Sequence, residues 1–177
     1  MKTDTHAIYY PSIKTLKEIK LEVFSDASFA NLEDRVSSAM GFVIFVTHKN
    51  RACCLGWRAG KVKRVVKSTL AAEALALSEG VGEAVYLQRM INELLMFSPP
   101  IIAHVDSKGL VDQLNSTKLV YERMLRIDIG IIKEMLERKQ IEVVRWCSSD
   151  EQLADVLTKR GADGSRLMNA LAQGSLI

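Results

Sequence analysis

Several residue types that mark other protein classes are scarce in this sequence of 177 residues. It has three cysteines, too few for a disulfide framework, and two of them, Cys53 and Cys54, are adjacent. Aromatic residues make up only 6% of the chain, which disfavours an all-β sandwich. No apolar run approaches the roughly 20 residues that span a bilayer, and the polar start lacks the apolar core of a secretory signal. We therefore expect a soluble, intracellular protein in a reducing compartment, the cytoplasm or the nucleus.

A large excess of one charge is also missing. The 24 basic and 21 acidic residues give a formal net charge of +3, which is too balanced to indicate a nucleic-acid partner without local patches. Hydrophobic residues, in contrast, make up 48% of the chain, enough to bury the core of one ordinary domain. Because Leu, Ile, Val, Ala and Met supply most of this bulk, an α/β fold is favoured.

The hydrophobic pattern predicts a particular order of elements. Strands are expected over residues 20–30, 38–48 and 51–57, and two more over 101–106 and 141–146. Helices are expected from an N-cap at Ser68 or Thr69 to about Phe97, and over 108–116, 121–139 and 148–160. In the helix over 121–139, the predicted apolar stripe consists of Met124, Ile127, Ile131 and Met135. This order predicts a mixed sheet flanked by helices, with three antiparallel strands and two strands reached through helical crossovers.

Four carboxylates could meet in such a fold: Asp26, Glu73, Asp106 and Asp155. Asp26 lies in the first strand and Asp106 ends the fourth, and ligand sites gather at strand ends in α/β sheets. Converging carboxylates repel one another and favour hard cations such as magnesium or manganese, whereas zinc is disfavoured. Two such ions can promote displacement at phosphorus, so the pattern predicts nucleic-acid hydrolysis.

Each of these acids lies in a distinctive local string. FSDASFANLEDRVSSAMGFVIF contains Asp26, STLAAE ends in Glu73, HVDSKGLVDQL contains Asp106, and EQLADVLTK contains Asp155. The strings resemble, in the same order, those of ribonuclease H domains at the end of copia-type retrotransposon polyproteins. The last string repeats that family's Gln-Leu-Ala-Asp-x-Leu-Thr-Lys signature, whereas STLAAE has one extra residue in the family's Ser-Thr-x-Ala-Glu motif.

The resemblance implies both a fold and an activity. It implies a ribonuclease H-like domain with a five-stranded mixed sheet over residues 20–160. Residues 1–19 would be an N-terminal extension or the end of a preceding polymerase or connection segment, and 161–177 a C-terminal extension. The implied enzyme cleaves the RNA strand of an RNA/DNA hybrid during reverse transcription, using two Mg²⁺ ions or Mn²⁺ as a substitute. Asp26 and Asp106 would hold both ions, Glu73 the ion near the leaving group, and Asp155 the ion that activates water.

Basic residues near this site are the candidates for substrate binding. We expect contacts to the hybrid from Arg35, Lys63, Arg64, Lys67, Ser68 and Arg126. The loop before the last acid lacks the histidine that cellular ribonucleases H usually carry, and there is no room for a basic protrusion that grips the hybrid. Two alternatives remain open: a decayed or binding-only module, and another nuclease of the same superfamily, such as an integrase or transposase core.

Asp128, His104 and the cysteines are expected to have structural rather than catalytic roles. Asp128 rivals the four acids, but its helical position favours a structural pair with Arg or Lys. His104 shares a strand face with Asp106 and is expected to be a hydrogen-bonded structural histidine. The cysteines lack metal-binding spacing and are expected to be small core residues.

Overall fold

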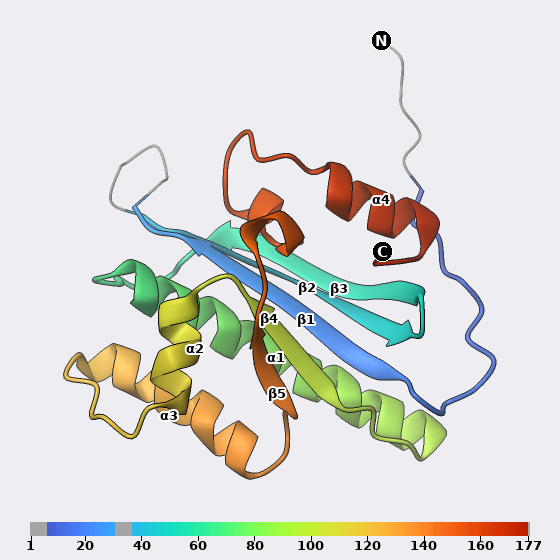
Figure 1. Cartoon of the computed structure of the whole chain (residues 1–177), viewed down its shortest axis with the longest axis horizontal. Coiled ribbons are helices and arrows are strands. Elements are labelled where there is room, and N and C mark those ends of the chain that lie inside the picture. Colours follow the sequence, from blue (N-terminus) through green and yellow to red (C-terminus); the bar gives the residue numbers. More distant parts are fainter. Residues whose placement is uncertain (1–6, 31–36, 177) are drawn as a thin grey trace.

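A five-stranded sheet with the order β3-β2-β1-β4-β5 forms the centre of the structure (Figure 1). A computed structural model describes residues 7–30 and 37–176. The strands are β1 (Lys20–Ser28), β2 (Ala39–His48), β3 (Arg51–Lys61), β4 (Ile101–Val105) and β5 (Val143–Trp146). Strands β1, β2 and β3 are antiparallel, whereas β4 runs parallel to β1 and β5 parallel to β4. The predicted mixed sheet is confirmed.

Within residues 7–30 and 37–176, four α-helices and two short 3₁₀ turns surround the sheet. They are α1 (Thr69–Leu95), α2 (Lys108–Asn115), α3 (Arg123–Glu137), η1 (Ser149–Glu151), η2 (Asp155–Leu157) and α4 (Ser165–Gln173). The start of α1 is the predicted one, because the Ser68 side chain accepts a hydrogen bond from the Ala71 N–H at 3.1 Å. The helix ends at Met96, which adopts a left-handed conformation and donates its N–H to the Asn92 carbonyl. None of the helices in the described ranges is long and apolar enough to cross a membrane.

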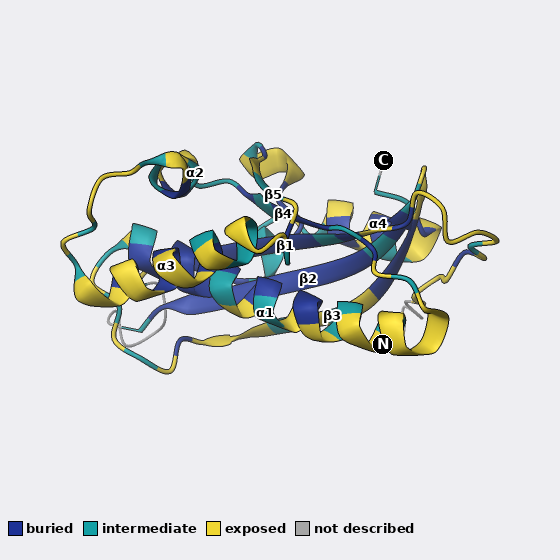
Figure 2. Cartoon of the chain, turned by 90° about the horizontal axis from the view of Figure 1, so that it is seen from below, coloured by how far each residue is buried: buried dark blue, intermediate teal, exposed yellow. Residues whose placement is uncertain are grey.

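Successive side chains of a strand point to opposite faces of the sheet, and here apolar side chains cover both faces. Leu21 and Val23 of β1 pack in a cluster with α1 and α3, whereas Phe24 packs in a second cluster with α4. Figure 2 shows the strands as mostly buried, with exposed residues on the outer sides of α1 and α3. Strand β1 is therefore covered on both faces, which fixes the register of the residues it carries into the site.

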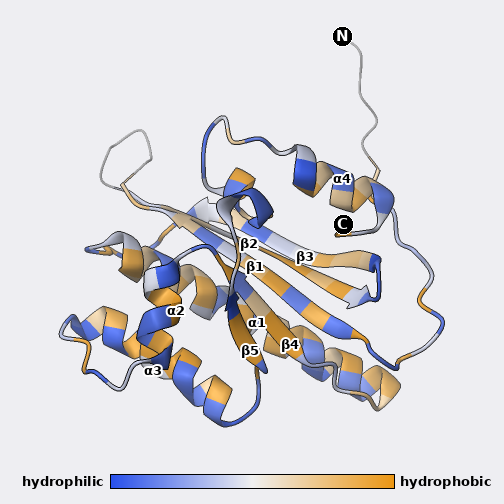
Figure 3. Ribbon diagram, viewed as in Figure 1, coloured by the Kyte–Doolittle hydropathy of each residue, from blue (hydrophilic) through white to orange (hydrophobic). Residues whose placement is uncertain are grey.

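The predicted apolar stripe of α3 is not the buried one. Leu125, Ile129 and Ile132 face the core, at 6%, 3% and 0% exposed. Of the four predicted residues, Met124, Ile127 and Ile131 are 42%, 45% and 39% exposed. The fourth, Met135, is partly buried and packs against the core. Hydrophobic and hydrophilic bands alternate along this helix (Figure 3). Two neighbouring stripes are thus apolar, and tertiary contacts choose between them.

An ion pair accompanies the buried stripe of α3. Asp128 lies on this stripe, where its side chain is 4% exposed, and it pairs with Arg64. Burial raises the pKa of Asp128, and the Arg64 guanidinium opposes that effect. The expected structural pair of Asp128 is confirmed, and it explains how a helix face that carries a carboxylate can be buried.

The predicted terminal helix over 148–160 is wrong. Residues 148–160 form η1 and η2 instead, and the last α-helix, α4, begins at Ser165. Between the two turns Gln152 is extended, with ψ 100°, and its side chain donates a hydrogen bond to the Ser25 carbonyl at 3.0 Å. This contact with β1 replaces the hydrogen bonds of a continuous helix, so a tertiary interaction overrides the local helical signal.

Residues from the two sequence ends lie together beside β3. The Tyr9 N–H donates to the Leu171 carbonyl at 2.8 Å, and the Ala52 N–H donates to the Gly174 carbonyl at 2.7 Å. Gly174 adopts φ 64°, and a Cβ at this position would lie 2.6 Å from Pro11 Cδ. Only glycine fits this close approach at the end of α4. The described parts of both predicted extensions therefore pack against the sheet, while the proposed domain boundaries stay a prediction.

Candidate active site

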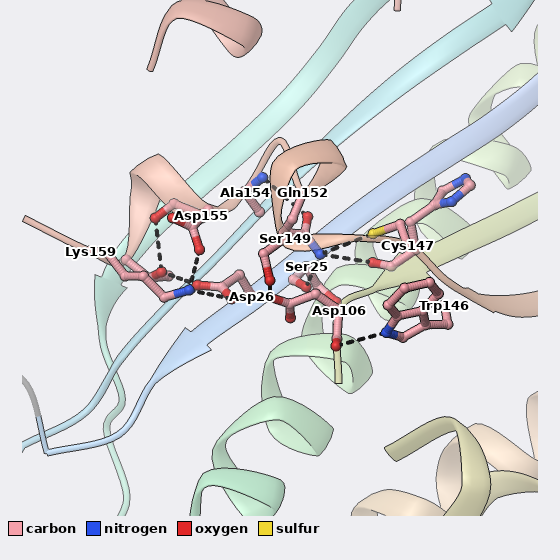
Figure 4. A network of polar contacts seen from close by, with 12 residues as sticks. Ser25, Asp26, Asp106, Trp146, Cys147, Ser149, Gln152, Ala154, Asp155 and Lys159 are labelled. Atoms are coloured by element: carbon pink, nitrogen blue, oxygen red, sulfur yellow. Dashed lines mark hydrogen bonds and ion pairs between the residues drawn. The ribbon is translucent and has the colours of Figure 1, made fainter. Parts of the chain in front are cut away.

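Three of the four predicted acids converge at one end of the sheet. One carboxylate oxygen from each of Asp26, Asp106 and Asp155 lies within 4.8 Å of the other two (Figure 4). Asp26 is near the end of β1 and Asp106 directly follows β4, and these strands are parallel neighbours. Their carboxyl ends therefore meet at the same edge, as the sequence predicts. Asp155 reaches the same place as the first residue of η2.

Glu73, the fourth predicted acid, lies beside this cluster but outside the group that meets within 4.8 Å. It is in α1 and only 5% exposed, and it accepts a hydrogen bond from the Ala27 backbone. Burial, together with the nearby carboxylates of Asp26 and Asp106, raises the pKa of Glu73 to about 9. Its Oε2 atom has no hydrogen-bond partner among the described residues. Glu73 is thus a buried acid with one oxygen that accepts no hydrogen bond, and it is repelled by the carboxylates of Asp26 and Asp106.

Asp26 is the most enclosed carboxylate of the cluster, at 1% exposed. Burial raises the pKa of Asp26 to about 6, although the hydrogen bond that the Thr158 hydroxyl donates to its Oδ2 atom opposes this effect. Its Oδ1 atom is buried without a hydrogen-bond partner in the described part of the chain. The Nζ atom of Lys159 lies 3.7 Å from that oxygen, too far for a hydrogen bond.

The chemistry of these side chains fits a hard divalent cation. The donors are all carboxylate oxygens, which magnesium and manganese prefer, and no cysteine or histidine belongs to the cluster of described residues. Two buried oxygens, Asp26 Oδ1 and Glu73 Oε2, accept no hydrogen bond from the described residues, which is costly without a metal ion. The residues present therefore fit a metal site.

Polar contacts fix the segment that carries Asp155. The Gln152 amide donates to the Ser25 carbonyl, while its Oε1 atom accepts from the Ala154 N–H at 3.2 Å. The Ser149 hydroxyl donates to Asp106 Oδ2 at 3.1 Å, so the same segment also orients a cluster carboxylate. Figure 4 shows these residues around the acids. They were not predicted as site residues, although Gln152 lies in the string that resembles the family signature.

No protein-family model matches this chain. Curated relatives do exist: it is 28% identical over 160 residues to the retrovirus-related Pol polyprotein from transposon RE1 of Arabidopsis thaliana, which covers 89% of this chain. It is 29% identical over 141 residues to the corresponding polyprotein from transposon TNT 1-94 of Nicotiana tabacum, covering 78% of this chain. In both cases the chain spans about 10% of the length of the relative.

Solved structures show the same fold. The N-terminal RNase H domain of Rv2228c from Mycobacterium tuberculosis matches with a TM-score of 0.59 and 19% identity, covering 88% of this chain and 97% of that one. LC11-RNase H1 in complex with an RNA/DNA hybrid, an enzyme isolated from compost, matches with a TM-score of 0.59 and 18% identity, covering 78% and 94%. The chain is thus similar in sequence to transposon Pol polyproteins and has the ribonuclease H fold.

In this ribonuclease H fold, the missing side chain of Gly41 makes room for η2. Gly41 pairs with Asp26 across β1 and β2, and a Cβ there would lie 2.7 Å from Leu157 Cβ and 3.3 Å from Thr158 Cγ2. Any larger residue must therefore push η2, and Asp155 with it, away from Asp26. The close approach gives a physical reason for glycine at this position, which lies in the same family-like string as Asp26.

Replacing Gly41 with valine should therefore damage the site as well as the fold. We expect a loss of about 1–3 kcal/mol in the free energy of unfolding, the usual cost of overpacking, together with weaker divalent-metal binding. Urea denaturation and a metal titration measure the two effects. Gly56→Val in β3 is the matched control, because nothing lies within 4 Å of a Cβ at Gly56. Equal behaviour of the two variants would contradict the proposed packing role.

The predicted substrate contacts of this ribonuclease H fold lie in different environments. Lys63, Lys67 and Arg126 are exposed, whereas Arg64 is engaged in the ion pair with Asp128. Ser68 uses its side chain to cap α1. Arg35 lies outside the described residues. Binding of a hybrid by any of these side chains stays a prediction.

His104 and the cysteines have the structural roles that the sequence indicates. The Nε2 atom of His104 lies 2.5 Å from Glu22 Oε2, and its ring stacks on Phe24 with a centroid distance of 4.6 Å. The three cysteines are buried free thiols. Both predictions are confirmed.

Proposed function

We propose that this chain is a metal-dependent endonuclease that cleaves the RNA strand of RNA/DNA hybrids, as the ribonuclease H part of a retrotransposon reverse transcriptase. The observation that carries the proposal is the convergence of Asp26, Asp106 and Asp155 at the edge of a ribonuclease H sheet. Homology to transposon Pol polyproteins supports a nuclease in a polyprotein context. The structurally similar LC11-RNase H1, which was solved with an RNA/DNA hybrid, supports the choice of substrate.

The cluster acids would hold the metal, with magnesium as the preferred ion and manganese as a substitute. Bound divalent metal would supply activation of water and stabilisation of negative charge on the scissile phosphate. Asp26 and Asp106 are the central ligands in this proposal, because they lie at the ends of adjacent parallel strands. Thr158 fixes Asp26 and Ser149 orients Asp106, so the carboxylates are held in place before a cation arrives.

Recognition of the hybrid is proposed to come from the surroundings of this cluster. The RNA strand differs from DNA by its 2′-hydroxyl groups. Buried Glu73 is the acid proposed to lie nearest the 2′-hydroxyl at the cleavage point. Exposed Lys63, Lys67 and Arg126 are the proposed phosphate contacts. Attachment to a polymerase and a location in the cytoplasm or nucleus complete the proposal.

The test is cleavage of a labelled RNA/DNA hybrid by the purified chain. We expect products from the RNA strand with Mg²⁺ or Mn²⁺ present, no products with a chelator, and none from DNA duplex or RNA duplex. Because the relatives are much longer, the same assay should include the chain fused to its polymerase. Hybrid binding without cleavage in both forms would support a binding-only module instead. Strand transfer into duplex DNA would instead support an integrase-type or transposase-type nuclease.

A further inference from the structure

The ammonium group of Lys159 lies inside the carboxylate cluster. Its Nζ atom forms an ion pair with Asp155 Oδ1 and lies 3.7 Å from Asp26 Oδ1. Figure 4 shows the nitrogen between these two carboxylates. The side chain is 40% exposed, so it enters the cluster from the solvent side. A positive charge therefore already stands among the acids that would hold a metal.

The backbone of η2 places this charge. The N–H groups of Thr158 and Lys159 both donate to the Asp155 carbonyl, at 3.1 and 3.0 Å. This turn directs the Thr158 hydroxyl to Asp26 Oδ2, which leaves Asp26 Oδ1 facing the Lys159 ammonium. The two oxygens of Asp26 therefore have different partners. Oδ2 accepts a hydrogen bond from the neutral Thr158 hydroxyl, whereas Oδ1 faces the charged Lys159 ammonium.

One ammonium does not balance the cluster. Three carboxylates meet within 4.8 Å, and Asp26 Oδ1 stays buried without a hydrogen bond. A Mg²⁺ ion carries twice the charge and approaches carboxylate oxygens to about 2.0–2.1 Å. It would therefore need the same oxygens that Lys159 faces. The Lys159 ammonium and a metal ion are both positive, so they would repel each other strongly if both lay against these oxygens.

We propose that Lys159 is a tethered counter-ion, which neutralises Asp155 and Asp26 in the metal-free protein and which a divalent metal must displace. The inference rests on the proposed metal site but not on hybrid cleavage. As a consequence, metal binds only above a certain concentration. Below it Lys159 neutralises the acids, and above it the metal ion displaces Lys159 from them. Lys159 is then a competitor for the metal oxygens, in contrast to Thr158, which only orients one of them.

The test is a titration of metal-free protein with Mn²⁺, in which the electron paramagnetic resonance signal of free Mn²⁺ reports binding directly. We expect Lys159→Met to lower the half-saturating Mn²⁺ concentration about tenfold or more, because a competing charge has been removed. Lys159→Gln, a second neutral variant, should shift it in the same direction, whereas Lys159→Arg should stay near the wild type. Lys17→Met, an exposed change before the start of β1, removes the same charge far from the site and should have no effect.

Thermal unfolding gives a second readout. Without metal, Lys159→Met should melt at a lower temperature than the wild type, because Asp155 and Asp26 lose the positive charge that pairs with them. With saturating Mn²⁺ it should gain more in melting temperature than the wild type gains. Unchanged or weaker Mn²⁺ binding in the neutral variants would overturn the proposal, even if the wild type cleaves hybrids. Absence of Mn²⁺ binding in every variant would overturn both this proposal and the proposed metal site.

Discussion

Asp26→Asn should reduce cleavage of an RNA/DNA hybrid by at least about 1,000-fold, because it removes a charged ligand that each proposed metal needs. Asp26 is 1% exposed and its Oδ1 atom accepts no hydrogen bond from the described residues, so this oxygen is available to a metal ion. Asparagine has nearly the same volume, and the Thr158 hydroxyl can still donate to the retained carbonyl oxygen. The fold should therefore persist while activity is lost.

Single-turnover cleavage with excess enzyme measures this effect, since it isolates the chemical step from product release. Asp112→Asn is the matched control: Asp112 is exposed on α2, and the same change of charge there should leave the rate within about twofold. A circular-dichroism melt in the absence of metal shows whether the fold is intact. A variant that folds and still cleaves at more than a tenth of the wild-type rate would exclude Asp26 from the reaction.

Glu73→Gln should stabilise the metal-free protein at alkaline pH. Burial raises the pKa of Glu73 to about 9 from a usual value of 4.5, so the folded chain holds a proton that the unfolded chain has released. Stability from this group is complete below about pH 4.5 and is lost as the pH rises towards about 9. Asp26, with its pKa raised to about 6, adds a loss in the lower part of the same window. Glutamine removes the larger of these two losses.

We expect the metal-free variant to melt about 5 °C or more above the wild type at pH 8.5, and close to the wild type at pH 5. Glu83→Gln, an exposed change on the same helix, should show no such dependence on pH. Addition of Mg²⁺ should narrow the difference, because a cation near the acids compensates the charge of Glu73 in the wild type. A difference in melting temperature that is the same at both pH values would contradict the raised pKa of buried Glu73.

The parts of the fold that depend on local sequence patterns were predicted well. Alternation in the first three strands and the Ser68 cap of α1 are local signals, and both are confirmed. The meeting of Asp26 and Asp106 also follows from sequence, because parallel neighbouring strands end at one edge of a sheet. These features need no knowledge of distant contacts beyond the order of the elements.

Where tertiary contacts decide, the prediction was wrong. The buried stripe of α3 contains Asp128, whose partner Arg64 lies in a different segment, so helical periodicity alone could not select it. The segment after β5 has strong helical signals, but the hydrogen bond from Gln152 to Ser25 breaks it into η1 and η2. Such contacts join residues far apart in sequence and have no local signature.

The same limit applies to the site. Thr158 and Lys159 belong to the EQLADVLTK string, which was matched to a family signature, yet no role was predicted for them. Their contacts with Asp26 arise only because η2 lies against the end of β1, in the space that Gly41 leaves open. The acids of the cluster could therefore be predicted from the sequence, but the groups that control their charge could not.

The junction between Tyr9 and Leu171 has a consequence for the order of folding. A contact between residues from the two sequence ends can form only after nearly the whole intervening chain has been organised, because closing so large a loop costs conformational entropy that few local bonds repay. It should therefore form after the sheet and open before it. Helix α4 covers one face of that sheet and follows the segment with Asp155, so early fraying there would reach the candidate site before the core itself unfolds.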